Sequence, residues 1–203
     1  MSQLILIRHG QSEWNAENRF TGWVDSPLSD RGRDEAKRAG DRLAAQGVHV
    51  VRAFTSTLSR AIDTGQIILD VLGQGDLEQV RAWELNERFY GALTGRDKAQ
   101  TASEFGEKQV RVWRRSYDIA PPGGESLQDT ARRTLPYLER VIVPATRKAA
   151  VVLVSAHGNS LRSIVKELDG LDGEAVTRLE IGTGVPIIYE MTDGQPTDKR
   201  IVA

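Results

Sequence analysis

The sequence contains no cysteine, which removes several kinds of chemistry at once. Disulfide bonds, thiolate metal sites and cysteine nucleophiles are all excluded. The absence is neutral about the compartment in which the protein works. Any nucleophile or metal ligand must therefore come from other side chains.

Long apolar segments are also missing. The first apolar run covers only residues 4–7 and is followed at once by Arg8 and His9, which is too short and wrongly flanked for a signal peptide. No later stretch approaches the roughly 18 apolar residues that a membrane span requires. We therefore expect a soluble, cytoplasmic protein without a membrane partner.

A large charge imbalance is absent as well. The chain of 203 residues carries 27 Lys and Arg against 28 Asp and Glu, for a net charge of −1. Nothing in this balance favours nucleic acid or an anionic membrane as a partner, so attraction for anions must come from local clusters. Length and composition fit one globular domain, which we predict to span residues 1–203.

Apolar runs and helical stripes alternate along the chain. The runs have little polar alternation, which is typical of strands that are buried on both faces. Amphipathic segments with helix caps separate them. The pattern predicts an α/β domain with three layers (α/β/α) and a mostly parallel central sheet. The expected strands are residues 4–7, 48–55, 149–156 and 184–191.

The expected helices have recognisable beginnings and ends. Ser29 and Ser126 are good N-caps, and Asp129 completes a capping box with the second. Glycines end three of the helices, and Pro136 is expected to kink or restart one. The expected helices begin near residues 29, 58, 126 and 159. Residues 74–125 are polar and weakly periodic, and we predict that they form an insertion covering the active site.

Two histidines occupy the same kind of position. His9 follows the first predicted strand and His157 follows the most apolar one, and a glycine comes directly after each. In open α/β sheets, ligands bind beyond the carboxyl ends of the strands. A glycine there removes a Cβ and lets backbone N–H groups approach an anion. The third histidine, His49, has no such context, so we expect the first two to share one crevice.

Metal binding and nucleophilic catalysis are the two chemistries to compare. No pair of histidines has the spacing of a zinc site, and no third ligand accompanies them. Arginines do accompany them. A neutral imidazole can attack phosphorus to give a phosphohistidine, and guanidinium groups suit the charge on the transferred phosphoryl group. We therefore favour phosphoryl transfer without a metal.

These motifs resemble a known family. Residues 6–12, Leu-Ile-Arg-His-Gly-Gln-Ser, are similar to the signature of the histidine phosphatase superfamily, and residues 55–64 resemble its second arginine motif. Within the superfamily, further blocks resemble the cofactor-dependent phosphoglycerate mutases. They are residues 8–15, 20–29, 85–98, 113–118, 157–162 and 184–190.

The resemblance implies an isomerase of glycolysis and gluconeogenesis that interconverts 3-phosphoglycerate and 2-phosphoglycerate. His9 would be the phosphorylated nucleophile, and Arg8, Arg60 and His157 would surround the phosphoryl group. His157 is then expected to be protonated while His9 is neutral, which requires separated pKa values. Glu87 would be the general acid and base.

The resemblance also implies a set of substrate contacts and a primer. The enzyme would be primed by 2,3-bisphosphoglycerate, would use no metal, and would bind a small phosphorylated sugar acid. Adjacent arginines on a regular helix point about 100° apart, so the two arginines of the set need a segment that wraps the ligand. The implied substrate-binding residues are Ser12, Asn15, Thr21, Gly22, Arg88, Tyr90, Lys98, Arg114, Arg115, Gly158 and Asn159.

The main alternative is a histidine phosphatase that hydrolyses another small phosphorylated metabolite. It would share the histidine pair and the arginines around it but would not need Glu87 or the two adjacent arginines in this form. A non-catalytic anion-binding protein on the same fold would be expected to lack at least one transfer residue, and all are present.

One departure from longer family members concerns the lengths of two segments. The segment between Arg115 and His157 and the segment after Glu190 are both shorter here. If these segments seal the site or form a subunit contact in longer relatives, this chain would show more phosphatase activity or assemble differently as a homo-oligomer.

Overall fold

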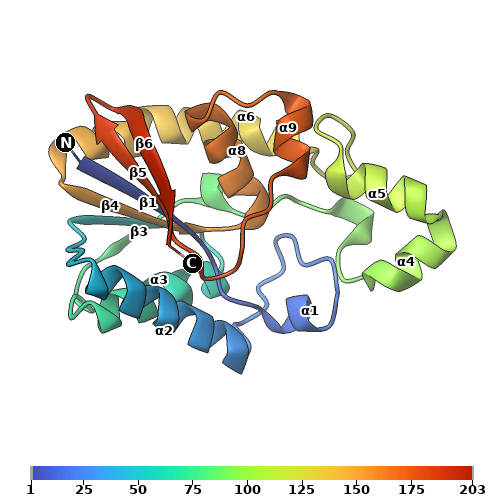
Figure 1. The fold of residues 1–203 in the computed structure, drawn as a ribbon. Coiled ribbons are helices and arrows are strands. Elements are labelled where there is room, and N and C mark those ends of the chain that lie inside the picture. Colours follow the sequence, from blue (N-terminus) through green and yellow to red (C-terminus); the bar gives the residue numbers. More distant parts are fainter. Residues whose placement is uncertain (1, 203) are drawn as a thin grey trace.

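A six-stranded sheet forms the centre of the protein in a computed structural model that describes residues 2–202 (Figure 1). The strand order is β3-β2-β4-β1-β5-β6. The first four strands in this order run parallel, whereas β5 is antiparallel to β1 and β6 is antiparallel to β5. The strands are β1 (Ser2–Arg8), β2 (Arg52–Thr55), β3 (Gln79–Arg81), β4 (Val151–Ala156), β5 (Ile187–Thr192) and β6 (Gln195–Ile201).

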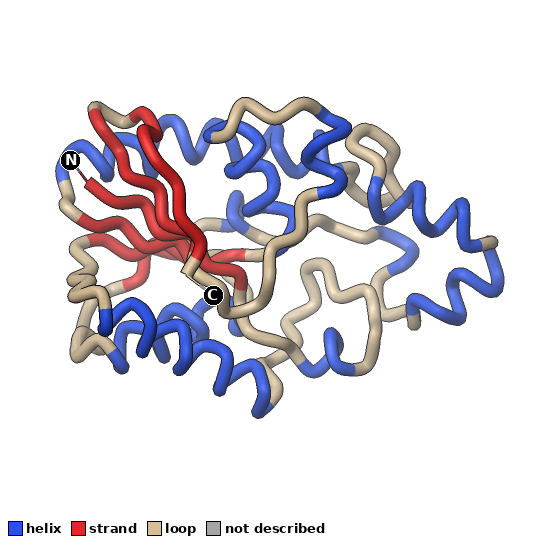
Figure 2. Tube along the Cα trace, viewed as in Figure 1, coloured by secondary structure: helices blue, strands red, loops and turns tan. Residues whose placement is uncertain are grey.

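Helices cover both faces of this sheet (Figure 2). Helices α2 (Asp30–Ala45) and α3 (Ser59–Val71) pack on one face. Helices α6 (Leu127–Tyr137), α7 (Val143–Lys148) and α8 (Gly158–Leu168) pack on the other. The predicted three-layer α/β/α fold with a mostly parallel sheet is therefore confirmed.

Three shorter helices lie beyond the sheet at the right of Figure 1: α1 (Glu13–Ala16), α4 (Lys98–Phe105) and α5 (Glu107–Arg115). The chain also forms two 3₁₀ turns, η1 (Trp83–Leu85) and η2 (Gly91–Leu93), and a short helix α9 (Gly173–Arg178) next to α8. Within residues 2–202, no helix is both long enough and apolar enough to cross a membrane.

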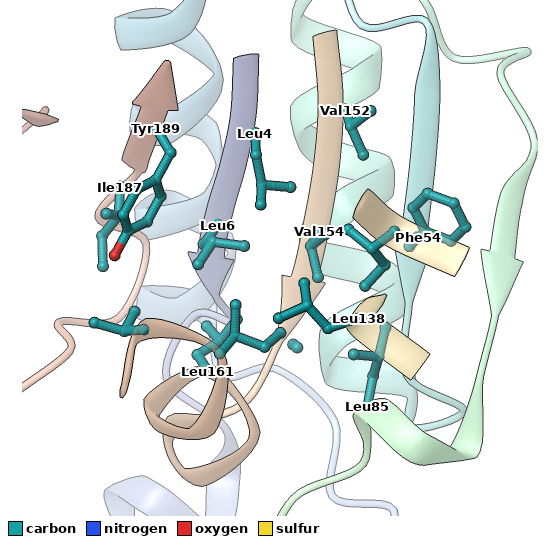
Figure 3. Packing of buried hydrophobic residues seen from close by; sticks show 14 of the residues in the cluster. Leu4, Leu6, Phe54, Leu85, Leu138, Val152, Val154, Leu161, Ile187 and Tyr189 are labelled. Atoms are coloured by element: carbon teal, nitrogen blue, oxygen red, sulfur yellow. The ribbon is translucent and has the colours of Figure 1, made fainter. Parts of the chain in front are cut away.

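The hydrophobic core consists of two clusters, one on each face of the sheet. Figure 3 shows the cluster under α6 and α8, where Leu4, Val154 and Leu161 are fully buried. Leu85 from η1 reaches the same cluster. Successive residues of β1 alternate between the clusters, since Ile5 belongs to the one under α2 and α3. The two covered faces explain why this strand reads as a continuous apolar run.

Two predicted strand boundaries were wrong, and an edge strand was missed. The strand expected from residue 48 begins only at Arg52, and the one expected at 184–191 is Ile187–Thr192. The last strand, β6, was missed because its sequence, Gln-Pro-Thr-Asp-Lys-Arg-Ile, has no apolar stripe. As an edge strand it pairs only with β5, so little of it needs to be buried.

The helix after Ser126 follows the predicted pattern. Ser126 and Asp129 form the expected reciprocal capping box. Pro136 lies in the last turn of α6, and the chain continues from Leu138 to Ile142 as a π-helical turn before α7 begins. Proline has no N–H, so Pro136 cannot donate to the Arg132 carbonyl one turn earlier. In the same way Pro144, in the first turn of α7, leaves the Arg140 carbonyl of the π-helical turn without its α-helical donor.

The segment 74–125 is not wholly outside the sheet. Its residues Gln79–Arg81 form β3, the edge strand beside β2. The three-residue strand is too short to give a periodic signal. The part that follows, from η1 to the end of α5, lies beyond the carboxyl ends of the parallel strands (Figure 1).

Gly10 and Gly32 allow the loop after β1 to touch the first turn of α2. A Cβ on Gly10 would lie 2.1 Å from the Gly32 carbonyl oxygen, and a Cβ on Gly32 would lie 2.0 Å from that of Gln11. Both contacts are with backbone, which has little room to move. The expectation that Gly10 is small in order to admit an anion was therefore incomplete, because α2 already requires a glycine there.

This contact predicts the sign of a substitution. Alanine normally stabilises a helix interior relative to glycine by about 1 kcal/mol. We expect Gly32→Ala to lower the free energy of unfolding instead, by about 1–3 kcal/mol, because the new Cβ overlaps the Gln11 carbonyl. Urea unfolding measures the change, and the exposed Arg38→Ala on the same helix is the control. A stabilised Gly32→Ala protein would contradict the close contact.

Candidate active site

The two histidines meet at the carboxyl ends of neighbouring strands. His9 follows β1 and His157 follows β4, and these strands pair in parallel with Arg8 opposite Ala156. The ring centroids lie 4.9 Å apart at an interplanar angle of 62°. Both side chains are buried. Two residues that are far apart in the sequence thus form one site, as the sequence analysis expected.

A backbone carbonyl orients the His9 ring. Its Nδ1 lies 2.6 Å from the carbonyl oxygen of Gly10, which can only accept a hydrogen bond, so Nδ1 carries the proton. In the neutral ring, Nε2 then has a free lone pair. Burial and the neighbouring Arg60 and Arg8 guanidinium groups hold the pKa of the imidazole well below its ordinary value of 6.5. His9 is therefore a neutral imidazole with Nε2 available as a nucleophile.

His157 is held from the opposite direction. Its Nε2 lies 2.7 Å from the Ser56 hydroxyl, which comes from the loop between β2 and α3. Its Nδ1 is buried and has no hydrogen-bond partner among the described residues. His157 is also the N-cap of α8, so the positive end of that helix points toward the site.

The expected protonation of His157 differs from what the site produces by itself. Burial, the Arg60 guanidinium and the nearby His9 lower the pKa of His157 well below 6.5. The charged groups that shift it most are cations, so they favour the neutral imidazole. The two imidazoles are therefore both neutral here, and separated pKa values would require an anion between them.

Two arginines stand beside the histidines. Arg60 is buried near the start of α3 and donates to the carbonyl oxygens of Gly22 at 2.7 Å and Val24 at 2.9 Å. Burial lowers its pKa to about 10, which leaves it charged at neutral pH. Arg8 donates from Nη1 to the Ile181 carbonyl at 2.8 Å, while its buried Nε has no partner in the described chain.

Glu87 is a buried carboxylate next to the same groups. Its Oε1 accepts hydrogen bonds from the Arg88 N–H at 2.7 Å and from the Asn159 side chain at 2.8 Å. Burial raises the pKa of the carboxyl, but these hydrogen bonds and the charges of Arg8 and Arg88 outweigh it, so the net pKa lies below the ordinary value. A Cβ on Gly158 would lie 3.7 Å from Oε2 and 3.6 Å from Arg8 Nε, so the first residue of α8 lies next to both charged groups.

Cationic side chains from the segment beyond the sheet complete the site. Arg88 is fully buried, donates to the Arg114 carbonyl at 3.0 Å and lies over the Tyr90 ring. Burial, with Arg114 and Arg8 nearby, lowers the pKa of Lys98 to about 8. Arg114 and Arg115 are the last two residues of α5, and both line the same cavity.

These groups surround one cavity of about 200 Å³, which suits a small metabolite. All of the predicted site residues line it except Ser12 and His157. The His157 ring lies beside that of His9, with the ring centroids 4.9 Å apart. Ser12 was expected to contact substrate, but its buried side chain caps α1 by accepting from the Asn15 N–H at 3.2 Å, so it supports Asn15.

Unpartnered polar atoms indicate what the cavity binds. Buried atoms without a hydrogen-bond partner in residues 2–202 include Arg8 Nε, Arg88 Nε, His157 Nδ1 and the Thr21 hydroxyl. Leaving such a group unpaired costs about 1–3 kcal/mol, so it indicates a missing ligand. Most of these atoms are donors or can become donors, which favours an anion.

The sequence analysis missed five residues of the site. Four line the cavity: Arg19, Phe20, Arg162 and Glu180. Phe20 and Arg162 belong to the family-like blocks, so those blocks were the available signal. Glu180 pairs with Arg115 at 2.6 Å and Arg162 at 3.4 Å, from a segment with no motif of its own. Ser56, which orients His157, lies inside the second arginine motif.

Metal chemistry has no ligand set in this part of the chain. Within residues 2–202, no group of three or more His, Cys, Asp or Glu side chains could hold a metal ion. The donor groups of the cavity are mainly guanidinium and ammonium groups, which bind anions.

The lowered pKa values predict a loss of stability in mild acid. Below about pH 6.5 the unfolded chain takes up protons on His9 and His157, while the folded protein does not. The free energy of unfolding therefore decreases as the pH is lowered. Between pH 6.5 and 5.5 each histidine contributes up to about 1 kcal/mol. Comparing urea unfolding of wild type and His9→Gln at both pH values should show a smaller pH dependence in the variant. An equal dependence would argue against a depressed His9 pKa.

Comparison with known families agrees with the geometry. Residues 4–202 match the family described as histidine phosphatase superfamily (branch 1). A 2,3-bisphosphoglycerate-dependent phosphoglycerate mutase of Parvibaculum lavamentivorans is 54% identical over 190 residues, which cover 94% of this chain and 90% of that protein. A phosphoglycerate mutase of Schizosaccharomyces pombe is 50% identical over 200 residues, covering 98% and 95%. These relatives are about as long as this chain, so its short segments are not peculiar to it.

Solved structures of similar fold include several phosphatases. Bacillus stearothermophilus YhfR aligns with a TM-score of 0.84 at 27% identity, covering 97% of this chain and 95% of that one. A mycobacterial glucosyl-3-phosphoglycerate phosphatase in complex with VO3 aligns with a TM-score of 0.82 at 26% identity, covering 94% and 93%. The fold is thus shared with proteins that are only about half as similar in sequence as the mutases above.

Proposed function

Because the chain belongs to the histidine phosphatase superfamily, we propose that it is a mutase that interconverts 3-phosphoglycerate and 2-phosphoglycerate through a phosphohistidine at His9. Relatives named as phosphoglycerate mutases, at 50–54% identity over nearly the whole chain, support this choice. The structural neighbours named as phosphatases are only about half as similar in sequence.

The observation that carries the proposal is the number of charged groups that line one small cavity. His9, Arg8 and Arg60 line it together with Lys98, the two α5 arginines and the Glu87 carboxylate. A sugar acid that carries a phosphate and a carboxylate needs several cationic groups. A simple monoester phosphatase needs only those beside the nucleophile.

His9 would take the phosphoryl group by in-line attack of Nε2 on phosphorus. The N–P bond forms while the bond from phosphorus to the sugar-acid oxygen breaks. Arg8, Arg60 and the N-terminus of α8 stabilise the charge on the equatorial oxygens. His157 Nδ1 is buried without a partner. Once an adjacent anion raises the pKa of His157, the protonated ring would also stabilise the charge on these oxygens.

Glu87 would move the proton that the exchange requires. As a carboxylate it takes the proton from a substrate hydroxyl when that oxygen accepts the phosphoryl group from His9. In the reverse half-reaction the protonated carboxyl returns the proton to the leaving oxygen. Its pKa below the ordinary value places it in the basic form at the start of the first step.

The residues present also fit 2,3-bisphosphoglycerate as primer. Arg8 and Arg88 both line the cavity and each has a buried Nε without a partner, so the site offers free donors to more than one anionic group. The bisphosphorylated acid supplies the phosphoryl group that His9 carries. Cover of the cavity by the segment after β3 would protect that group from water.

Assay of the purified protein with 3-phosphoglycerate tests this function. With a trace of 2,3-bisphosphoglycerate, isomerisation should be faster than phosphate release, and EDTA should leave the rate unchanged because the site has no ligand set for a metal. Both products are measured in one reaction. Release of phosphate without isomerisation would instead support a histidine phosphatase acting on a small phosphorylated metabolite.

Two substitutions separate the nucleophile from the acid–base group. We expect His9→Ala to abolish labelling by radiolabelled 2,3-bisphosphoglycerate, because no Nε2 remains to attack. Glu87→Gln should slow transfer by roughly 10²–10⁴-fold with little loss of binding. Acid-labile label retained in the His9 variant would rule out this nucleophile, and a normal rate in the Glu87 variant would rule out that acid–base role.

A further inference from the structure

The segment that carries Glu87 has little regular structure of its own. After the 3₁₀ turn η1, residues 86–90 form no helix or strand. Leu85 anchors the segment on one side, because its side chain is fully buried in the core beside Leu138 (Figure 3). The position of the Glu87 carboxyl therefore depends on what holds the rest of the segment.

Arg133 on α6 binds the backbone of this segment from the other side. Its Nη1 donates to the carbonyl oxygens of Glu84 at 2.8 Å and Asn86 at 3.0 Å, and its Nη2 donates to that of Glu87 at 2.9 Å. One guanidinium group thus binds three carbonyls within four residues. The side chain is only 8% exposed, so water does not replace it easily.

Glu125 takes the remaining N–H groups of Arg133. The carboxylate forms a bidentate pair with Nε and Nη2, both at 2.9 Å. All five N–H groups of the guanidinium therefore have an acceptor. Glu125 also accepts the Phe89 N–H at 2.9 Å and donates its own N–H to the Phe89 carbonyl at 2.7 Å. The pair holds both ends of residues 84–89.

Trp23 links the same point to the loop that carries Thr21 and Gly22. Its Nε1 donates to the Glu87 carbonyl at 2.5 Å, and its ring lies 5.5 Å from the Arg133 guanidinium. The Glu87 carbonyl thus accepts from two side chains, Arg133 and Trp23, that also contact each other. Hydrogen bonds that share an acceptor and a donor group in this way restrict the backbone to one geometry.

We propose that Arg133 is a positioning residue for the Glu87 carboxyl: through the carbonyl groups of residues 84, 86 and 87 it fixes the proton-transferring group against Asn159 and the histidine pair. Arg133 does not line the cavity, so it acts through the segment rather than on substrate. This inference rests on one part of the proposed function, namely that Glu87 is the general acid and base.

Arg133→Lys is the substitution that tests this role. Lysine keeps the charge but has one nitrogen in place of the planar fork, so it cannot bind the three carbonyls and Glu125 together. Because small displacements of a catalytic group are costly, we expect kcat for isomerisation to fall on the order of 10²-fold, while KM changes little. Methionine has no hydrogen-bond donor in its side chain, so kcat should fall further in Arg133→Met.

Arg132→Lys is the matched control. Arg132 neighbours Arg133 on α6 but is exposed and pairs with Asp129 on the surface. Its replacement should leave kcat and the thermal midpoint close to those of wild type. Thermal unfolding of each variant identifies a protein that has lost its fold, and Arg133→Lys serves if Arg133→Met does not fold.

The leaving group distinguishes positioning from a general structural role. Phosphorylation of His9 by p-nitrophenyl phosphate needs no proton from Glu87, since the nitrophenolate leaves as an anion. We expect Arg133→Lys to keep this reaction within a few-fold of wild type while losing transfer from a sugar-acid oxygen. In a Glu87→Gln background, Arg133→Lys should add little further loss, because both changes remove the same contribution.

Three results would overturn the inference. They are wild-type isomerisation by folded Arg133→Lys protein, equal loss with both leaving groups, and a double variant slowed by the product of the two single effects. Wild-type protein decides the proposed function separately. If it only hydrolyses phosphate esters, the same comparison of alcohol and nitrophenol leaving groups still tests Arg133.

Discussion

The pairing of β1 with β4 is the interaction on which the site depends. The two strands run parallel in register, so Arg8 stands opposite Ala156 and the next residue on each strand is a histidine. Both strands are buried on their two faces, which fixes their relative position. The contact of His9 and His157 therefore follows from the core of the sheet rather than from a flexible loop. Rigid supports of this kind suit a reaction that needs in-line geometry.

The site holds several positive charges close together in a buried place, where charged groups are costly. Several guanidinium groups share one small cavity, and Glu87 and Glu180 are the carboxylates that line it within the described chain. Backbone carbonyls offset part of the cost, as where Arg60 binds those of Gly22 and Val24. Burial and the arginine charges keep both imidazoles neutral, and the remaining unpaired donors make the cavity selective for anions.

Sequence patterns predicted those parts of the protein that have a local physical cause. Buried strands, helix caps such as Ser126, and the two histidines after strands all leave a signal in neighbouring residues. The polar edge strand β6 left none, since its pairing with β5 needs backbone groups rather than apolar side chains. Glu180 was missed for a related reason, because its role depends on arginines from two other helices.

Other differences arose where one residue serves two needs. Gly10 read as an anion-binding glycine, yet the close approach of α2 is sufficient to require it. Ser12 read as a substrate contact, yet it caps the short helix that carries Asn15. The protonation of His157 depends on the balance between burial and several charges, which no local pattern reports. Distances between elements decide each of these cases.

The hydrogen bond from His9 Nδ1 to the Gly10 carbonyl also determines the regiochemistry of the modified protein. An imidazole can form two isomeric phosphoramidates, one on each nitrogen. Here Nδ1 donates to the Gly10 carbonyl. Only the Nε2 isomer can therefore form without rotating the ring and breaking that hydrogen bond. After phosphorylation, Nδ1 still bears its proton and still donates, so the ring that receives the group is already oriented to give it back.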